Sequence, residues 1–199
     1  MDDADIIQRS WQQPADFAVL FRRHAPAIQR YAERRLGAHA AEDVVAETFL
    51  VAFRQRRGYD VARPDARPWL YGIATNLIGR YRRAEIRQYR AFAATGTDPV
   101  LEPFTDQVDA RVSAGAATRR LAAALARLPA GQRDALLLVA WADLSYEQAA
   151  LSLGVPVGTV RSRLSRARGS LRRWLGDLDP PDAETDPGQP LAHRGGTQT

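Results

Sequence analysis

The chain has 199 residues, 45% of them hydrophobic, which is enough for one or two small domains with packed cores. It carries a net charge of +5 and 28 basic side chains, all arginine, and the absence of cysteine excludes disulfides, thiolate zinc sites and a thiol redox sensor. No run approaches the roughly 18 apolar residues of a membrane span. The acidic N-terminus lacks the basic and apolar regions of a signal peptide. We therefore expect a cytoplasmic protein without a membrane partner.

The N-terminal part of the sequence predicts two helices. Residues 1–12 show no clear pattern, and we expect them to be loosely ordered. A first helix is predicted over residues 14–36, because apolar residues recur there at helical spacing, and it ends at Gly37. A second helix spans residues 39–57. Its first turns carry acids that suit the positive end of the helix dipole, namely Glu42, Asp43 and Glu47.

A third, arginine-rich helix follows a loop over residues 58–68 that glycine and proline punctuate. It starts between Asp65 and Pro68 and continues through residue 92, with one apolar face and with arginines crowding its later turns. Residues 54–90 hold ten arginines against three acids. Such a local excess of one sign is typical of a surface that contacts a polyanion.

Helical periodicity stops after residue 93. Residues 94–111 are rich in glycine, threonine, proline and acids, which predicts a flexible linker. Helical patterns resume over residues 112–128 and 130–142, and residues 177–199 predict a disordered acidic tail. No strand pattern and no repeat is evident. The sequence thus predicts an all-α protein with two small helical domains, at residues 1–93 and 112–176, joined by the linker.

Residues 143–175 predict a helix-turn-helix. Ser145 and Gln148 have the spacing of a capping box, Gly154 ends the short first helix, and Pro156 sets up the second. An apolar stripe on the second helix is formed by Val160, Leu164, Ala167, Leu171 and Trp174 or Leu175. The stretch 157–175 also holds six arginines and no acid. An ordinary solvated face mixes signs, so this composition favours a helix that enters the DNA major groove.

Three segments resemble a known family. LARLPAGQRDALLLVAWADLSYEQAALSLGVPVGTVRSRLSRARGSL resembles domain 4 of the extracytoplasmic-function (ECF) sigma factors, which are small two-domain bacterial initiation factors. AEDVVAETFLVAFR and WLYGIATNLIGRYRR resemble domain 2 of that family, so the resemblance covers about residues 14–93 and 112–175. It implies a non-enzymatic sigma factor that binds core RNA polymerase, recognises the −10 and −35 promoter elements and promotes initiation. It also implies an anti-sigma factor as a partner, although no residue identifies one.

The resemblance places −35 contacts on the early turns of the second helix of the motif. Arginine can bridge O6 and N7 of guanine, and each such pair discriminates between bases by roughly 1–3 kcal/mol. We expect base contacts from Arg161, Ser162, Ser165 and Arg166, and phosphate contacts from Arg163 and Arg168. For each residue the alternative is a phosphate contact or none.

In domain 2 the resemblance implies contacts with the −10 element. Asn76 corresponds to an asparagine near the flipped base, and its amide can both donate and accept a hydrogen bond. Tyr59 lies in the loop that pockets this base and can stack on it. Arg80, Arg82 and Arg83 are expected to follow the DNA backbone. For Trp69, a second aromatic in this region, core packing is the favoured role.

The second predicted helix carries the residues that correspond to the polymerase-binding surface of the family. These residues are Asp43, Val44, Glu47, Thr48 and Phe49. A helix that shows acids beside apolar groups suits a coiled coil with basic residues, as in the clamp of the largest polymerase subunit. The alternative is that the acids favour the helix dipole and that Phe49 belongs to the core.

Other functions remain as alternatives. A conventional helix-turn-helix transcriptional regulator with an α-helical effector or dimerisation domain is one, but such a domain does not need the basic, asparagine-containing helix 69–90. An adaptor or anti-sigma protein is disfavoured by two separate basic modules. His39 with Glu42 and Asp43 has metal-ligand spacing, yet a solvated helix start is favoured. No phosphate-binding loop or nucleophile–base pair occurs, so we expect no catalytic site, metal or cofactor.

Overall fold

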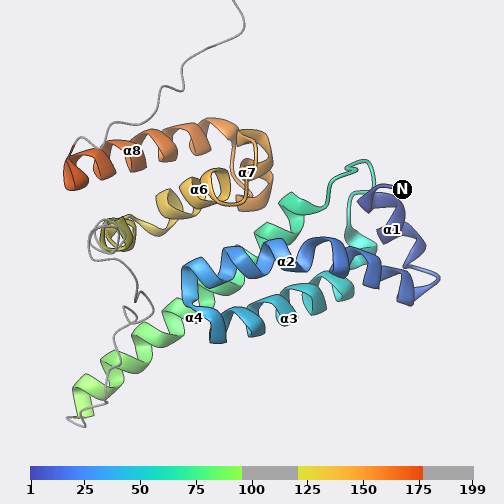
Figure 1. Ribbon diagram of the computed structural model, residues 1–199, viewed down its shortest axis with the longest axis horizontal. Coiled ribbons are helices and arrows are strands. Elements are labelled where there is room, and N and C mark those ends of the chain that lie inside the picture. Colours follow the sequence, from blue (N-terminus) through green and yellow to red (C-terminus); the bar gives the residue numbers. More distant parts are fainter. Residues whose placement is uncertain (96–120, 177–199) are drawn as a thin grey trace, which may run out of the picture.

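The computed structural model describes residues 1–95 and 121–176, with side chains described for 1–83 and 121–176. Every regular element in these ranges is helical, which confirms the all-α prediction. The predicted tail, most of the predicted linker and the first part of the predicted helix 112–128 lie outside the described residues, although 121–127 are helical. In chain order the elements are α1 (Asp3–Arg9), η1 (Pro14–Asp16), α2 (Phe17–Leu36), α3 (Ala38–Gln55), η2 (Arg56–Gly58), α4 (Arg67–Thr95), α6 (Ala130–Ala140), α7 (Tyr146–Leu153) and α8 (Val157–Leu175) (Figure 1).

The chain begins with a helix, so the prediction that residues 1–12 are loosely ordered is wrong. Asp2 and Asp5 form a capping box at the start of α1: the Asp2 side chain accepts from the Asp5 N–H at 2.8 Å, and the Asp5 side chain accepts from the Asp2 N–H at 3.1 Å. Ile6 and Ile7 are completely buried. A helix of seven residues is too short for its apolar periodicity to be recognised in the sequence.

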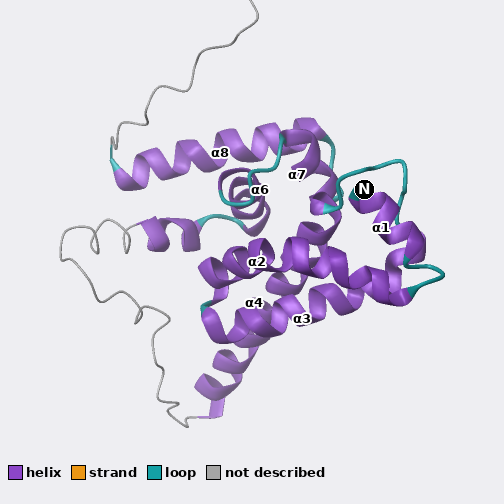
Figure 2. Cartoon of the chain, turned by 45° about the vertical axis from the view of Figure 1, so that its right-hand side comes forward, coloured by secondary structure: helices purple, strands orange, loops and turns teal. Residues whose placement is uncertain are grey.

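Helices α2, α3 and α4 pack together as the N-terminal bundle, with α1 against one end (Figures 1 and 2). The turn between α2 and α3 is made by Gly37, whose φ of +82° is accessible to glycine without strain. The largest buried side chains here include Leu20, Ile28, Tyr31, Val44, Leu70 and Ile78. The hydroxyls of Tyr31 and Thr75 are 3.0 Å apart, so these buried polar groups satisfy each other across α2 and α4.

The structure confirms the predicted helix-turn-helix in α7 and α8. Ser145 Oγ accepts from the Gln148 N–H at 3.2 Å, and Gln148 Oε1 accepts from the Ser145 N–H at 2.9 Å, which completes the capping box. Gly154 ends α7 with φ at +62°, and Pro156 directly precedes α8. The apolar stripe of α8 turns inward, since Val160, Leu164 and Ala167 are buried.

The helix-turn-helix rests on the N-terminal bundle (Figure 2). α7 packs across α4 so closely that a Cβ at Gly72 would lie 2.7 Å from the carbonyl oxygen of Ser152. Arg35 near the end of α2, whose side chain is 2% exposed, forms an ion pair with Asp134 of α6. Gln148 Nε2 of α7 also donates to Asp65 Oδ2 at 2.9 Å, so the close backbone approach, the buried ion pair and this hydrogen bond all join the two halves of the chain.

Candidate nucleic-acid interface

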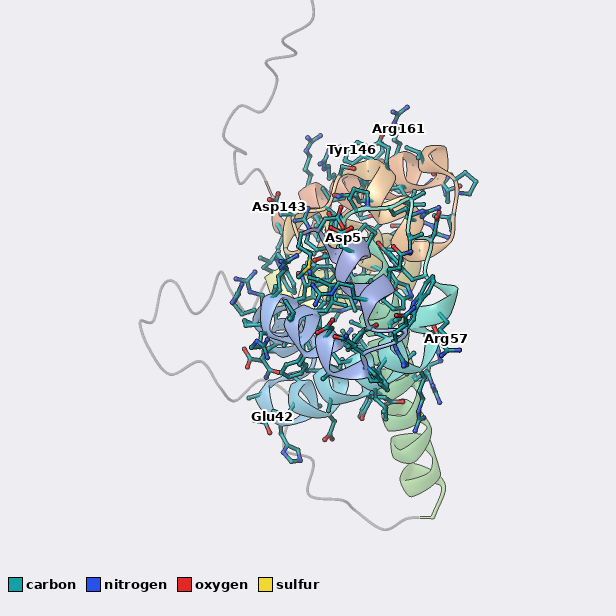
Figure 3. All side chains as sticks on the ribbon, turned by 90° about the vertical axis from the view of Figure 1, so that its right-hand side faces the viewer. Asp5, Glu42, Arg57, Asp143, Tyr146 and Arg161 are labelled. Carbon is teal, nitrogen blue, oxygen red and sulfur yellow. The ribbon has the colours of Figure 1, made fainter. Side chains whose placement is uncertain are left out.

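Helix α8 carries an exposed basic face, which we name the α8 surface. It consists of Arg161, Ser165, Arg166 and Arg168. Arg161 points away from the body of the molecule in Figure 3. The opposite face of α8 is fixed by the buried apolar stripe against α6, so these four side chains remain available to a partner in the solvent.

Two other residues predicted to contact the −35 element are more restricted than the α8 surface. Ser162 is half-buried and its hydroxyl donates to the Thr159 carbonyl at 3.0 Å, a contact within α8 itself. Arg163 is half-buried as well, because its guanidinium packs on α6, where a Cβ at Gly131 would lie 3.1 Å from Arg163 Cζ. The structure therefore distinguishes Arg163 from its exposed neighbours, which the sequence pattern alone could not do.

An acid borders the α8 surface. Glu147, exposed in the first turn of α7, accepts a hydrogen bond from Ser145 Oγ at 3.0 Å. Its own backbone N–H, this hydroxyl and the charge of Arg161 lower the pKa of the Glu147 carboxyl. The start of α7 thus places an ionised carboxylate near Arg161, a neighbour that the sequence analysis had not considered.

The later turns of α4 carry a second exposed polar face, which we name the α4 surface. Asn76, Arg80 and Arg83 are exposed, and their spacing of four and three residues places them on one side of the helix. Arg82 is half-buried and donates from Nη2 to the carbonyl oxygen of Arg35 at 2.6 Å. Three of the four residues predicted here on α4 therefore form one face, whereas Arg82 contacts the end of α2.

Tyr59 lies inside the molecule. It is 8% exposed, its hydroxyl donates to the Arg63 carbonyl at 2.6 Å, and its ring centroid is 4.9 Å from that of Trp69. Burial, followed by the charges of nearby acids, raises the pKa of Tyr59 to about 12. The ring therefore supports the loop from within, and the exposed residues of that loop are its neighbours at 60–64.

The residues predicted to bind polymerase divide into two groups on α3. Asp43 is exposed and Glu47 half-buried, whereas Val44, Thr48 and Phe49 are buried. Two other apolar side chains accompany the acids on the outside. Leu50 is 47% exposed and Phe21 of α2 is 44% exposed. The α3 surface is therefore formed by Asp43, Glu47, Leu50 and Phe21.

Leu50 and Phe21 were missed by the sequence analysis. Leu50 stands three residues after Glu47 and seven after Asp43, so helical spacing alone could have placed it on the acidic face. Phe21 joins this face because its ring packs edge-on against Phe49, with centroids 4.9 Å apart. That contact links α2 to α3, and no local pattern announces it.

Two further findings concern metals and membranes. Within the described ranges, no group of three histidine, aspartate or glutamate side chains is placed to hold a metal ion. Both His39 and Glu42 of the candidate considered above are exposed at the start of α3 (Figure 3 labels Glu42). Among the helices described, none is both long and apolar enough to cross a membrane.

Comparisons with known proteins place these surfaces in a family. Residues 20–88 match the model of sigma-70 region 2, and residues 118–171 match that of sigma-70 region 4. The chain is 38% identical over 163 residues to the ECF RNA polymerase sigma factor SigL of Mycobacterium tuberculosis, an alignment that covers 80% of this chain and 89% of SigL. The chain belongs to the ECF sigma factor family. This confirms the resemblance noted in the sequence.

Other similarities agree with this assignment. The ECF sigma factor SigE of Mycolicibacterium smegmatis is 38% identical over 161 residues, covering 78% of this chain but only 60% of SigE. The solved structure of CnrH in complex with the cytosolic domain of CnrY superposes with a TM-score of 0.64 at 27% identity, covering 89% of this chain and 99% of CnrH. The α4 surface lies in the part that matches region 2, and the α8 surface in the part that matches region 4.

Proposed function

We propose that this ECF sigma-family chain binds core RNA polymerase, recognises the −10 and −35 elements of bacterial promoters and promotes transcription initiation. In this proposal residues 1–93 act as domain 2, residues 112–176 act as domain 4, and the chain works in the cytoplasm without a cofactor or a catalytic group of its own. Bond formation in RNA belongs to the polymerase.

One observation carries the proposal: a single chain presents two exposed basic faces, each in the region of the family that fits it. The α8 surface has Arg161 and Arg166 on early turns of the helix, where side chains can reach base edges in the major groove. The α4 surface combines Asn76, able to donate to and accept from a base edge, with Arg80 and Arg83 for the backbone. The two faces lie on different helices, the α4 surface in the part that matches region 2 and the α8 surface in the part that matches region 4, as contact with two separated promoter elements requires.

The α3 surface is the proposed site for the polymerase. Its acids Asp43 and Glu47 precede the exposed Leu50 on the same side of α3, so it offers both charge and apolar area to a basic helical partner. The charges of these acids also reach α4: burial, followed by the charges of Asp43 and Glu47, raises the pKa of Tyr81. The buried Val44, Thr48 and Phe49 support this face from below rather than contacting the partner.

A conventional helix-turn-helix regulator is the second candidate, favoured by the α8 surface taken alone. The two candidates differ in a transcription assay with purified core polymerase. A sigma factor enables core alone to start at defined sites, whereas a regulator needs a sigma factor already present. We expect run-off transcripts with mapped, discrete start sites when this chain is added to core, and the absence of any start-site selectivity would refute the proposal.

Variants of α8 sharpen the same assay. Arg166→Ala is expected to reduce transcription from a promoter that needs its −35 element by about 10- to 100-fold, the value of one bidentate base contact. Arg173→Ala, at the exposed end of the same helix, removes the same charge outside the α8 surface and serves as the control. Equal losses for both would indicate general attraction to DNA and no base recognition by Arg166.

A protein partner that holds the chain inactive is also part of the proposal. The CnrH structure contains the cytosolic domain of CnrY, and the family resemblance suggests an anti-sigma factor as the class. The α3 surface is the place we expect such a protein to compete with polymerase, since it combines acids with exposed apolar groups.

A further inference from the structure

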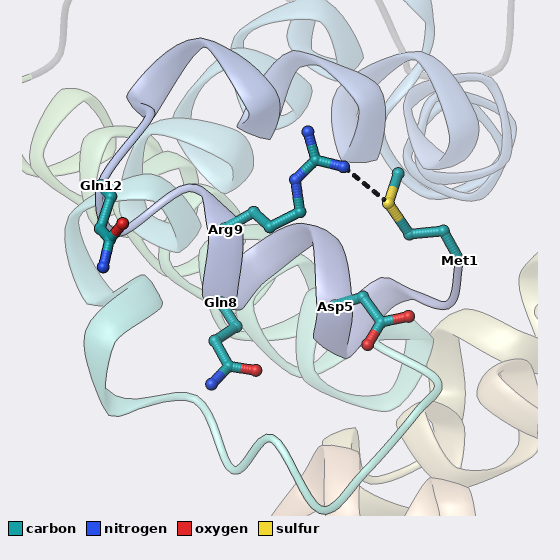
Figure 4. Close-up of a pocket in the computed structure, with 5 residues that line it drawn as sticks. All are labelled: Met1, Asp5, Gln8, Arg9 and Gln12. Atoms are coloured by element: carbon teal, nitrogen blue, oxygen red, sulfur yellow. Dashed lines mark hydrogen bonds between the residues drawn. The ribbon is translucent and has the colours of Figure 1, made fainter.

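Helix α1 lies outside both matched regions, since the region 2 match begins at residue 20. Its outer face is polar and borders a shallow hollow lined by Met1, Asp5, Gln8, Arg9 and Gln12, where Arg9 Nη1 lies 3.2 Å from Met1 Sδ (Figure 4). The inner face is buried and includes Ile6, Ile7 and the carboxylate of Asp3, which is 4% exposed. A buried carboxylate needs hydrogen-bond donors or a cation beside it, and the residues that supply them show which elements α1 holds together.

The partners of Asp3 lie on two other elements. Oδ1 accepts from Arg23 Nη1 at 2.6 Å, and Oδ2 accepts from His24 Nε2 at 2.8 Å, so both oxygens of the carboxylate are bound to α2. Oδ2 also accepts from the Ala66 N–H at 3.0 Å, and the Asp3 N–H donates to the Pro64 carbonyl at 3.1 Å. Asp3 therefore ties the end of loop 59–66, the segment just before α4, to both α1 and α2.

The state of this carboxylate agrees with its role as an acceptor. Burial alone would raise the pKa of Asp3, but the hydrogen bonds from His24 and Ala66, the charge of His24 and the hydrogen bond from Arg23 outweigh it and lower the pKa to about 2. The group is thus an anion whose oxygens are directed at three donors, one of which belongs to the loop backbone.

The segment after α1 holds the chain just before the loop. Trp11 Nε1 donates to the Arg56 carbonyl at 3.1 Å, and Arg56 Nε donates back to the Ser10 carbonyl at 3.3 Å. Arg57 Nη2 reaches the Trp11 carbonyl at 3.5 Å. The N-terminal segment therefore fixes η2 before the loop and residues 64–66 at its end, and between these two anchors the exposed turn at 60–63 is presented to the solvent.

We propose that α1 is a built-in positioning element for −10 recognition, in which Asp3 acts as a positioning residue that sets the geometry of loop 59–66. The inference rests on the proposed function, because that loop is the one expected to receive the flipped −10 base. Asp3 does not touch DNA in this account. It acts through the backbone of Ala66 and Pro64, which holds the loop in its binding conformation before the base arrives. Binding the base then costs no conformational entropy of the loop.

The test compares Asp3→Asn with Asp5→Asn in holoenzyme formed with core polymerase. Asparagine at position 3 keeps the size of the side chain but loses the charge and one acceptor oxygen. Its single oxygen cannot accept from Arg23, His24 and Ala66 together, and its NH2 group cannot accept from the donor that is left over. Asp5 lies on the same helix and is exposed, so Asp5→Asn removes the same charge and weakens only the capping box. A promoter mapped with the wild-type holoenzyme is substituted one base at a time in its −10 element, and transcription is measured for each template.

We expect Asp3→Asn to reduce the preference for the native −10 bases by about tenfold, the size of one base preference, with unchanged affinity for core and for the −35 element. Asp5→Asn is expected to keep the preference. Trp11→Phe, which keeps the ring and loses the hydrogen bond to Arg56, tests the other anchor without the folding risk of a buried acid and is expected to lower the preference in the same direction.

Two results would overturn the inference. In one, −10 preference survives in both Asp3→Asn and Trp11→Phe. In the other, core affinity, −35 affinity and −10 preference all fall by the same factor, as expected of a helix that only stabilises the fold. A wild-type chain that gives core no start-site selectivity would instead refute the proposed function, so the two failures are distinguishable.

Discussion

The two halves of the chain differ in their charged side chains: the N-terminal bundle buries several of them, whereas α8 exposes most of its own. On α8 most arginines are exposed, and residues 157–175 contain no acid to pair with them. In the N-terminal bundle several charged groups are buried and join separate elements, as Asp3 does with His24 and Arg35 with Asp134. The exposed arginines of α8 are therefore available to DNA, as Arg80 and Arg83 of the α4 surface are, whereas the buried Arg35 holds the fold together.

The difference follows from the range of the contacts. The capping box at Ser145 joins residues three apart, and the stripe of α8 repeats within each turn. Asp3 and His24 are 21 residues apart, and Arg35 and Asp134 are 99 apart. Short-range rules thus define the helix-turn-helix, and long-range polar contacts define the surroundings of the α4 surface. Mutations that remove long-range contacts and mutations that remove short-range contacts are therefore expected to change the unfolding free energy by different amounts.

The largest effect is expected from Arg35→Ala. The Arg35 side chain donates to Asp134 and, at 2.8 Å, to the Tyr31 hydroxyl, so its removal leaves a carboxylate without its cation at the junction of the two halves. Breaking a buried ion pair from one side costs about 3–5 kcal/mol, which urea unfolding can measure. Arg34→Ala is the matched control, because Arg34 is exposed and its Cζ lies 5.6 Å from the centroid of the Trp141 ring, a cation–π contact of about 0.5–1 kcal/mol. Similar losses for both would contradict the distinction between the two kinds of arginine.

The dependence of the unfolding free energy on pH tests the contacts that Asp3 makes with Arg23, His24 and Ala66. The folded pKa of about 2 lies below the ordinary value of 3.8, so the ionised carboxylate stabilises the fold above about pH 4, and this contribution is lost as the pH falls through 2. The shift corresponds to about 2 kcal/mol. We expect the difference in unfolding free energy between wild type and Asp3→Asn to be largest near pH 6 and to narrow at pH values below about 3. A difference that does not change with pH would show that the charge of Asp3 is unimportant.

The close approach of α4 and α7 is tested by two glycines of one helix. Gly72→Ala would place a Cβ 2.7 Å from the Ser152 carbonyl, a backbone atom that cannot turn aside, so we expect a loss of about 1–3 kcal/mol. Gly79→Ala meets only the flexible end of Arg83 at 3.6 Å, so the higher helix propensity of alanine is expected to stabilise α4 by up to about 1 kcal/mol. Thermal unfolding shows whether each variant is more or less stable than wild type. A more stable Gly72→Ala would mean that α7 does not lie against α4 at this point.

The sequence predicted the helix-turn-helix almost completely. Ser145, Gly154 and Pro156 each act on their own neighbours, so their roles follow from residue type and spacing. The outward direction of Arg161 and Arg166 followed in the same way, because the apolar stripe fixes which face of α8 turns to solvent. Arg163 was the exception, since only the position of Gly131 on α6 explains why it is half-buried.

The N-terminal half was less predictable. The predicted positions of α2 and α3 were correct to within a few residues, but α1 was not predicted. Tyr59 was expected to be free to stack on a base, whereas its ring is buried against Trp69. These features depend on partners distant in the sequence, such as the Pro64 carbonyl that binds the Asp3 N–H. Periodicity within a helix carries no information about such partners. The base contact of Asn76 and the DNA-backbone contact of Arg80 remain predictions that follow from family resemblance and exposure.

The smallest expected effect lies in the helix-turn-helix, where local rules predominate. Ser145→Ala removes the hydroxyl that accepts from the Gln148 N–H at 3.2 Å and should cost about 1 kcal/mol, the usual value of an N-cap. Ser165→Ala on the exposed face of α8 is the control and is expected to leave the unfolding free energy within about 0.5 kcal/mol of wild type. The experiment also bears on the comparison of the two halves. Because α7 packs on α4, a cap loss well above 1 kcal/mol would mean that the helix-turn-helix depends on long-range contacts as strongly as the N-terminal bundle does.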